Sequence, residues 1–517
     1  MKRRNFVKNV AFASVGAPFV LKGMQYQGIA KKLFETSKAA EDRVLVIIRL
    51  NGGNDGLNTL IPLDGYDNLA IQRSNVLIPQ NQLLNLNATN AFHPVMTGMK
   101  NLYQSGKLGI IQNVGYPEQN RSHFRSTDIW STGILNDPAE SRGWLGRHFD
   151  SYNPDYPTGY PNATYPDPFA ISMGSEVSET CQGIVANYSM AVNDPNTAYN
   201  LAGSSQTDDG TYYGAHMVYI ANLIDQTNAY GLNISNAANA GNSLSTLYDP
   251  NNETAMQLKN VAKLISGGLK SKVYVLNING FDTHNAQVGL SPEVGIHADL
   301  LKQLSDAIYA FQDDLNLLGL EHRVAGMTFS EFGRQIASNA SLGTDHGDAA
   351  PMFLFGSCVN TGFLGANPVI GNTIQNQAGI PMQIDFRDIY ASILKDWFEV
   401  NESDIQPLFE HTVTYYNVMN SCNLDVKENQ KDQLMEALLF PNPASSYTTL
   451  QFKSDNEWTR VAIYDMQGKE LLVVLDKTIE PGVHQLKMEI SNLTVGNYLV
   501  QIFKKSGTEK VNLVKVR

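Results

Sequence analysis

The sequence is poor in cysteine and in long apolar runs, and each shortage excludes a class of protein. Its three cysteines, Cys181, Cys358 and Cys422, are widely spaced and form no CxxC pair. Neither a disulfide framework nor a thiolate metal site is therefore indicated, although an oxidising compartment would permit one disulfide. Beyond the N-terminus no stretch reaches the roughly 18 apolar residues of a transmembrane helix, so we expect no membrane span in the mature protein.

Signals for nucleotides and nucleic acids are also missing. The turn at residues 51–56 lacks the Gly-x-Gly-x-x-Gly of dinucleotide-binding folds and the Gly-Lys-Ser/Thr of a Walker loop. The net charge is −12 and no long basic tract occurs, which argues against nucleic acid as a partner. Of the 517 residues, 43% are apolar and 17% are charged, so the chain has core material for two or more folded units.

Residues 1–40 have the composition of an export signal and its processing region. Basic residues between Lys2 and Lys8 precede a mildly apolar stretch, 10–21, that is too short to anchor the chain in a bilayer. The pair Arg3-Arg4 followed by Phe-Val-Lys resembles a twin-arginine signal, and a Sec signal is the alternative.

A repeated pattern organises residues 273–356. Short apolar runs, typical of buried parallel strands, each end in a carboxylate or an imidazole followed by a small turn, and residues 43–50 with the turn 51–56 match it. Polar residues at successive strand ends converge at one edge of a parallel sheet, so these side chains are candidates for one site. They are Asp55, Asp282, His284, Glu331, Asp345 and His346.

A further apolar run, 108–114, leads into a loop and a predicted helix that begins near Ser122. A serine at a helix N-terminus, with free backbone N–H groups beside it, suits an anionic substrate. Arg121 and Arg125 add cationic donors for phosphate or sulfate oxygens. Serine is also a common N-cap, and capping alone would explain Ser122 or Ser126 here.

The remaining segments outline the domains. We expect an α/β domain over 41–425, with an insertion of helices and loops near 186–254 and an amphipathic helix over 300–318. A polar linker at 426–436 precedes short alternating strands over 437–517, which predict a small β-sandwich. That unit offers no cluster of titratable groups.

The C-terminal unit resembles the type A sorting domain of the type IX secretion system of Bacteroidetes. The matching stretches are Phe440-Pro-Asn-Pro-Ala444, Val461 to Gly468, Leu493-x-x-Gly-Asn-Tyr498 and the basic last strand. The resemblance implies that the type IX machinery is a partner and that the protein is exported across the outer membrane to the cell surface or the medium. Type IX cargo usually uses the Sec route, so the twin-arginine pattern leaves the inner-membrane route open.

The central domain resembles the exported bacterial family called domain of unknown function 1501. The stretches that carry this resemblance are Asn51 to Asn58, Asn120-Arg-Ser-His-Phe124, Gly143 to Arg147, Phe281-Asp-Thr-His284, Ser330-Glu-Phe-Gly-Arg334 and Gly343-Thr-Asp-His-Gly347.

The order of these motifs is more distantly similar to the alkaline phosphatase and sulfatase superfamily. That similarity implies an α/β/α sandwich with a mostly parallel sheet and two divalent metal ions. It implies that Asp55 is the first metal ligand, Ser122 is the nucleophile, and Arg125 or Arg334 holds the non-bridging oxygens. Asp282 and His284 match an Asp-x-x-x-His pair of that superfamily, but with Asp-x-His spacing.

The later motifs can be aligned in two ways. Asp345-His346-Gly347 matches an Asp-His-Gly motif, which leaves His411 as the last ligand. Alternatively Glu331 replaces an Asp and His346 belongs to the later His-Gly block, which makes Glu331 and His346 ligands. We prefer the second alignment because it accounts for every strand.

These residues predict a surface-exported, metal-dependent hydrolase of a phosphate or sulfate ester, on a small molecule or a glycan. Carboxylates and imidazoles suit zinc, and also manganese, calcium or magnesium. A hydrolase with one metal follows if only some of the positions bind. The rival hypothesis is a surface binding or carbohydrate-handling accessory protein that keeps the fold without the chemistry.

Overall fold

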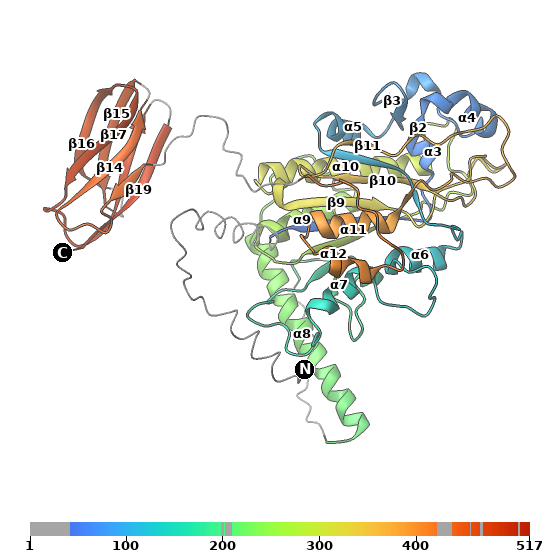
Figure 1. Cartoon of the computed structure of the whole chain (residues 1–517), viewed down its shortest axis with the longest axis horizontal. Coiled ribbons are helices and arrows are strands. Elements are labelled where there is room, and N and C mark those ends of the chain that lie inside the picture. Colours follow the sequence, from blue (N-terminus) through green and yellow to red (C-terminus); the bar gives the residue numbers. More distant parts are fainter. Residues whose placement is uncertain are drawn as a thin grey trace, which may run out of the picture. The chain divides into compact units, whose positions relative to one another are not determined.

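The computed structural model describes residues 42–197, 201, 209–420, 437–454, 456–465, 469–504 and 507–516. The chain divides into two compact units, with the boundary between Cys422 and Asn423 (Figure 1). The export signal predicted at 1–40 and the linker predicted at 426–436 lie outside the described residues.

The N-terminal unit is built on a nine-stranded, mostly parallel sheet, as predicted. Along its main path the order is β11 (Gly362–Leu364), β5 (Leu108–Gly115), β10 (Ala350–Phe355), β9 (Val324–Phe329), β1 (Val44–Asn51), β8 (Val273–Asn279), β6 (Ala170–Met173) and β7 (Ser189–Val192). A short strand, β12 (Ile384–Asp385), pairs with β5. Among these strands β10 alone runs antiparallel to its neighbours.

Helices cover both faces of this sheet, because the central strands are apolar on both sides. Alternate residues of β1 enter two separate cores: Val46 and Ile48 face one, Leu45 and Ile47 the other. The first core includes α5 (Thr97–Gln104), α8 (Tyr212–Ala240), α9 (Glu253–Ser266) and α10 (Ile296–Leu317). The second includes α6 (His123–Thr132), α7 (Trp144–Tyr152) and α11 (Phe386–Asp396), which confirms the α/β/α sandwich (Figure 1).

Two features depart from the segment boundaries read from the sequence. Residues 189–192, inside the predicted insertion, form the edge strand β7 of the main sheet, and α8 supplies most of the rest. After β1 the chain also forms a small three-stranded sheet and helix α4 (Tyr66–Arg73). The strand order of this sheet is β2 (Leu60–Pro62), β4 (Asn90–Phe92) and β3 (Leu84–Asn85). Its core is separate from the other two and lies beside residues 336–380.

The C-terminal unit consists of two antiparallel sheets. One contains β13 (Leu438–Phe440), β14 (Tyr447–Ser454) and β17 (Gly482–Glu489). The other contains β16 (Glu470–Ile479), β15 (Glu457–Tyr464), β18 (Gly496–Lys504) and β19 (Gly507–Lys515). Apolar residues of both sheets form one core, so the predicted all-β unit is confirmed.

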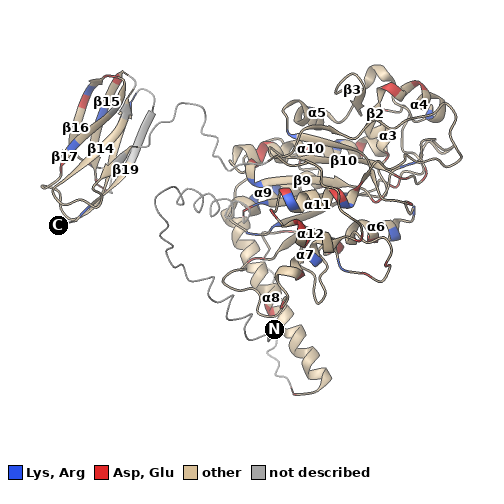
Figure 2. Ribbon diagram, in the orientation of Figure 1, with Lys and Arg blue, Asp and Glu red and all other residues tan. Residues whose placement is uncertain are grey.

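Charged residues of both signs occur along the described parts of the chain. Basic and acidic residues are interspersed along the ribbon of both units (Figure 2). Within the described part of the chain, no helix combines the length and apolarity needed to cross a membrane. Cys181 is buried and free, and Cys358 is disulfide-bonded.

Candidate metal centre

Five loops meet at the carboxyl edge of the main sheet. Three of them follow β1, β8 and β9, one connects β5 to α6, and one precedes the antiparallel strand β10. Gly52, in the loop after β1, has a positive φ of 124°, and a Cβ there would lie 2.3 Å from the backbone nitrogen of Asp282. The close approach of these two loops therefore requires glycine.

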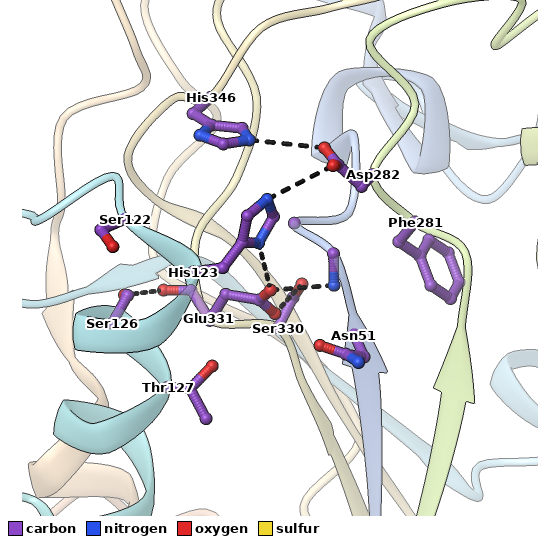
Figure 3. A network of polar contacts seen from close by, with 12 residues as sticks. Asn51, Ser122, His123, Ser126, Thr127, Phe281, Asp282, Ser330, Glu331 and His346 are labelled. Atoms are coloured by element: carbon purple, nitrogen blue, oxygen red, sulfur yellow. Dashed lines mark hydrogen bonds and ion pairs between the residues drawn. The ribbon is translucent and has the colours of Figure 1, made fainter.

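Three imidazoles and one carboxylate form a compact group at this edge, which we call the histidine cluster: His123, Asp282, His284 and His346. His284 Nε2 lies 2.8 Å from His346 Nε2 and 3.2 Å from Asp282 Oδ1. Asp282 Oδ1 is 3.4 Å from His346 Nε2, and Asp282 Oδ2 is 3.5 Å from His123 Nε2 (Figure 3). The side chains come from α6 and from the loops after β8 and before β10.

The other ring nitrogen of each histidine is held by an oxygen acceptor. His123 Nδ1 donates to Glu331 Oε1 at 2.9 Å, and His284 Nδ1 donates to Asp345 Oδ1 at 2.9 Å. His346 Nδ1 donates to the Arg121 carbonyl at 2.8 Å. Since a carbonyl only accepts, and an ionised carboxylate only accepts, all three Nδ1 atoms carry hydrogen. In the neutral rings the Nε2 atoms then present lone pairs to the centre of the cluster.

In these tautomers the Nε2 atoms face acceptors of the cluster, not hydrogen-bond donors, among the described residues. Two neutral acceptors 2.8 Å apart, such as His284 Nε2 and His346 Nε2, repel one another unless a proton or a cation lies between them. His123 Nε2 is buried and has no hydrogen-bond partner among the described residues. A centre of this kind favours a bound cation.

Arg334 fixes the geometry of Asp282. The guanidinium is 1% exposed, and its Nη2 donates to Asp282 Oδ1 at 2.7 Å. It also donates to the backbone carbonyls of Gly52, Gly53, Phe281 and Thr344, which ties three loops together. Burial alone would raise the pKa of Asp282, but the hydrogen bond and charge of Arg334 lower it below the ordinary value. Asp282 is therefore an anion at neutral pH.

The surroundings shift the pKa values of His123 and His346 in opposite directions. The hydrogen bond from His123 to Glu331 raises the pKa of His123 above its ordinary value. Burial, with the charge of Arg334 next, lowers the pKa of His346. The hydrogen bond from His284 lowers the pKa of Asp345, so that carboxylate stays ionised and orients the ring.

The family of the chain follows from a match over most of its length. Residues 42–409 match the model of the protein of unknown function DUF1501. The chain belongs to this family. In this DUF1501 protein, residues 438–516 also match the secretion system C-terminal sorting domain, which confirms the type IX sorting unit and implies export to the cell surface or the medium.

Two of the solved structures to which the chain is similar are remote in sequence and in fold. The lipoteichoic acid synthase LtaP from Listeria monocytogenes has 10% identity and a TM-score of 0.32, covering 72% of this chain and 75% of that one. Ps i-CgsB in complex with k-i-k-neocarrahexaose has 9% identity and a TM-score of 0.30, covering 87% and 86%. At these values the similarities carry no argument about activity. No curated protein matches the DUF1501 chain.

The six metal ligands predicted from the sequence lie in three different settings. Asp282, His284 and His346 face one another in the histidine cluster. Glu331 and Asp345 lie behind the cluster, where they accept hydrogen bonds from His123 and His284, respectively. Asp55 has no contact with the cluster: it is fully buried and accepts bonds from Arg73 Nη1 at 3.0 and 3.2 Å and from Gln287 Nε2 at 2.6 Å.

The predicted catalytic residues beside the cluster are also spread out. Ser122 is the exposed N-cap of α6 and makes no capping hydrogen bond with its side chain. Arg125 donates through Nη2 to the Leu135 carbonyl at 2.8 Å. Ser126 is buried and donates to the Glu331 carbonyl at 2.5 Å, so it joins α6 to the loop after β9 (Figure 3).

Sequence reasoning missed His123. His123 lies in the Asn120–Phe124 motif, but the sequence interpretation assigns functions to Ser122 and Arg125 and none to His123. The available signal was position: side chains in the first turn of a helix that follows a strand point toward the same sheet edge as the strand ends.

The donor set fits a divalent metal ion. One ligand atom from each of His123, Asp282 and His346 lies within 4.8 Å of the others. Imidazole nitrogens with one carboxylate oxygen are typical zinc ligands, and a carboxylate or carbonyl acceptor behind each imidazole is the usual second layer of such sites. His284 Nε2 is outside this set of three but lies beside it, 2.8 Å from His346 Nε2 and 3.2 Å from Asp282 Oδ1.

Proposed function

We propose that this DUF1501 domain is a metal-dependent hydrolase of phosphate or sulfate esters, with one divalent ion held by His123, Asp282, His284 and His346. The observation that carries the proposal is the orientation of the three histidines, whose Nδ1 atoms are all engaged as donors. Their Nε2 atoms then face one another and the Asp282 carboxylate, and His123 Nε2 has no hydrogen-bond partner among the described residues.

This proposal changes the ligand set that the sequence predicted. Glu331 and Asp345 orient His123 and His284 rather than bind the ion. Asp55 is neutralised by Arg73 and stabilises the fold around the loop after β1. A single mixed site replaces the two-metal site that the superfamily resemblance implied.

Zinc fits the donor set best, since imidazole suits zinc and a mainly nitrogen site does not suit calcium or magnesium. Manganese is the second choice. When bound, such an ion supplies Lewis acidity toward an ester oxygen and lowers the pKa of a hydroxyl or a water beside it.

The residues of the chain supply orientation and the nucleophile. Ser122 is the nucleophile in this proposal, because its hydroxyl is exposed, makes no capping bond and adjoins His123. The free N–H groups in the first turn of α6 can hold the non-bridging ester oxygens. Arg334 has all its contacts with Asp282 and backbone carbonyls, so it positions the carboxylate. Arg125 supports the loop at Leu135.

The test is hydrolysis of p-nitrophenyl phosphate, bis(p-nitrophenyl) phosphate and p-nitrophenyl sulfate by the full chain reloaded with zinc or manganese. We expect turnover of at least one ester, lost in His284→Ala/His346→Ala. His216→Ala is the matched control, because His216 is exposed on α8 and bonds only the Tyr212 carbonyl.

A Ser122→Ala variant separates the nucleophile from the metal. Loss of turnover with metal retained supports Ser122, whereas unchanged turnover would assign the attack to water. Metal binding without turnover of any ester would refute the hydrolase proposal and favour the binding-protein hypothesis.

A further inference from the structure

A cavity lies at the opposite edge of the main sheet from the histidine cluster. It has a volume of about 520 Å³, within the roughly 300–1,000 Å³ range of small-molecule sites. Its walls come from α7, from the segment before β6, from the segment before β8 and from the residues after α11. Because β8 has seven residues at roughly 3.3 Å each, the two sites are about 20 Å apart.

Aromatic rings form much of the wall. Tyr165 and Phe169 lie with ring centroids 5.2 Å apart, and His148 and Tyr152 lie 5.3 Å apart. Tyr152 is 53% exposed and Tyr165 is 39% exposed, so part of each ring remains open to a ligand at the cavity. Neither Tyr152 nor Tyr165 belongs to the buried core beneath them.

Polar groups with spare hydrogen-bonding capacity stand among these rings. Burial lowers the pKa of His148 to about 4, so the ring is neutral at neutral pH and carries one donor and one acceptor. Neither ring nitrogen has a partner among the described residues. Asp167 Oδ2 accepts from the Lys270 backbone N–H at 2.9 Å, and its Oδ1 has no bond of its own there.

The cavity is lined by charges of both signs. Lys270, Lys272, Asp167 and Glu399 are all among its lining residues. Arg43 lies 3.0 Å from Glu399 and pairs with it. The lining therefore offers both donors and acceptors of hydrogen bonds.

We propose that this cavity binds a neutral oligosaccharide. Sugars present flat C–H faces that stack on Tyr152 and Tyr165, and hydroxyl groups that both donate and accept at His148, Lys270 and Asp167. A purely apolar ligand would shield the unpaired polar atoms of His148 and Asp167 from water without hydrogen-bonding them, which is costly. The inference does not rest on the proposed ester hydrolysis, since the two sites share no side chain.

Isothermal titration of the purified full chain tests this proposal with five neutral hexasaccharides: cellohexaose, laminarihexaose, xylohexaose, mannohexaose and chitohexaose. We expect at least one to bind, and Tyr165→Ala to weaken that binding at least tenfold. Tyr165→Phe keeps the ring face and should bind within about twofold of the parent.

Two further variants make the outcome decisive. Lys270→Ala, an exposed change, should weaken binding without affecting the fold, while His346→Ala removes a metal ligand and should bind sugar like the parent. The proposal is overturned if no hexasaccharide binds. Binding that survives a Tyr152→Ala/Tyr165→Ala change would overturn it equally.

Discussion

Replacing Arg73 with methionine tests whether Asp55 stabilises the fold or binds metal. Both side chains are 0% exposed, and the ion pair joins them at 3.0 Å. Arg73 also donates to the carbonyls of Ile336 and Gln335, so it joins α4 to the loop after β9. Removing one member of a buried ion pair costs about 3–5 kcal/mol, because the remaining charge has no partner.

The groups around Asp55 determine how much stability the Arg73→Met change removes. Burial alone would raise the pKa of Asp55, yet the charge of Arg73 holds it below the ordinary value. Without Arg73 the carboxyl group would take up a proton, and the Gln287 bond at 2.6 Å would remain. We therefore expect a loss toward the lower end of the range, about 3 kcal/mol.

The assay is urea unfolding of the parent, Arg73→Met, Asp55→Asn and the double variant, with metal content measured on each. The double variant should lose less stability than the two single losses combined, by roughly 1–3 kcal/mol, because each change removes the partner of the other. All four proteins should keep their metal. If Asp55→Asn loses its metal while Arg73→Met unfolds like the parent, Asp55 is a ligand and this reasoning is refuted.

Three further predictions concern the supports of the histidine cluster. Glu331→Gln should weaken metal affinity by about 10- to 100-fold in a competition titration, because the carboxylate that orients His123 is lost; an unchanged affinity would contradict this. Gly52→Ala should cost roughly 1–3 kcal/mol in urea unfolding and release metal, since its Cβ would meet the backbone of Asp282. Gly106→Ala, also at a positive φ but in open space, is its control and should keep the metal. In metal-free protein, the raised pKa of His123 adds stability that is fully present below its ordinary 6.5 and is lost as pH rises through the raised value. The melting temperature of the parent should therefore exceed that of His123→Asn most near about pH 5 and least near about pH 8, and a constant difference would contradict the assignment.

The fold could be predicted from the sequence where local pattern decides it. Residues 43–50 and 324–329 are rich in apolar residues, and the buried parallel strands β1 and β9 form at these positions. The helix predicted over 300–318 corresponds to α10, which begins four residues earlier and ends one residue sooner. The edge strand β7 was missed because its four residues pair only with β6, and such short strands have no periodicity of their own.

For the site, the sequence predicts which loops come together but not how each side chain is oriented. Carboxyl ends of parallel strands converge, so the proximity of Asp282, His284 and His346 could be predicted without the structure. Whether a carboxylate faces the centre or a neighbouring side chain depends on partners far along the chain. Asp55 bonds Arg73, and Glu331 bonds His123, 208 residues before it in the sequence. Spacing carries no information about such long-range pairing.

Elemental analysis of the full chain, purified without chelator or affinity metal, tests the central claim most directly. The parent and His216→Ala should each hold about one zinc or manganese ion per chain, and His284→Ala/His346→Ala should hold none. Absence of metal from the parent, even after reloading, would contradict the metal centre. Equal metal in the parent and the double variant would place the ion elsewhere and contradict the assigned ligands.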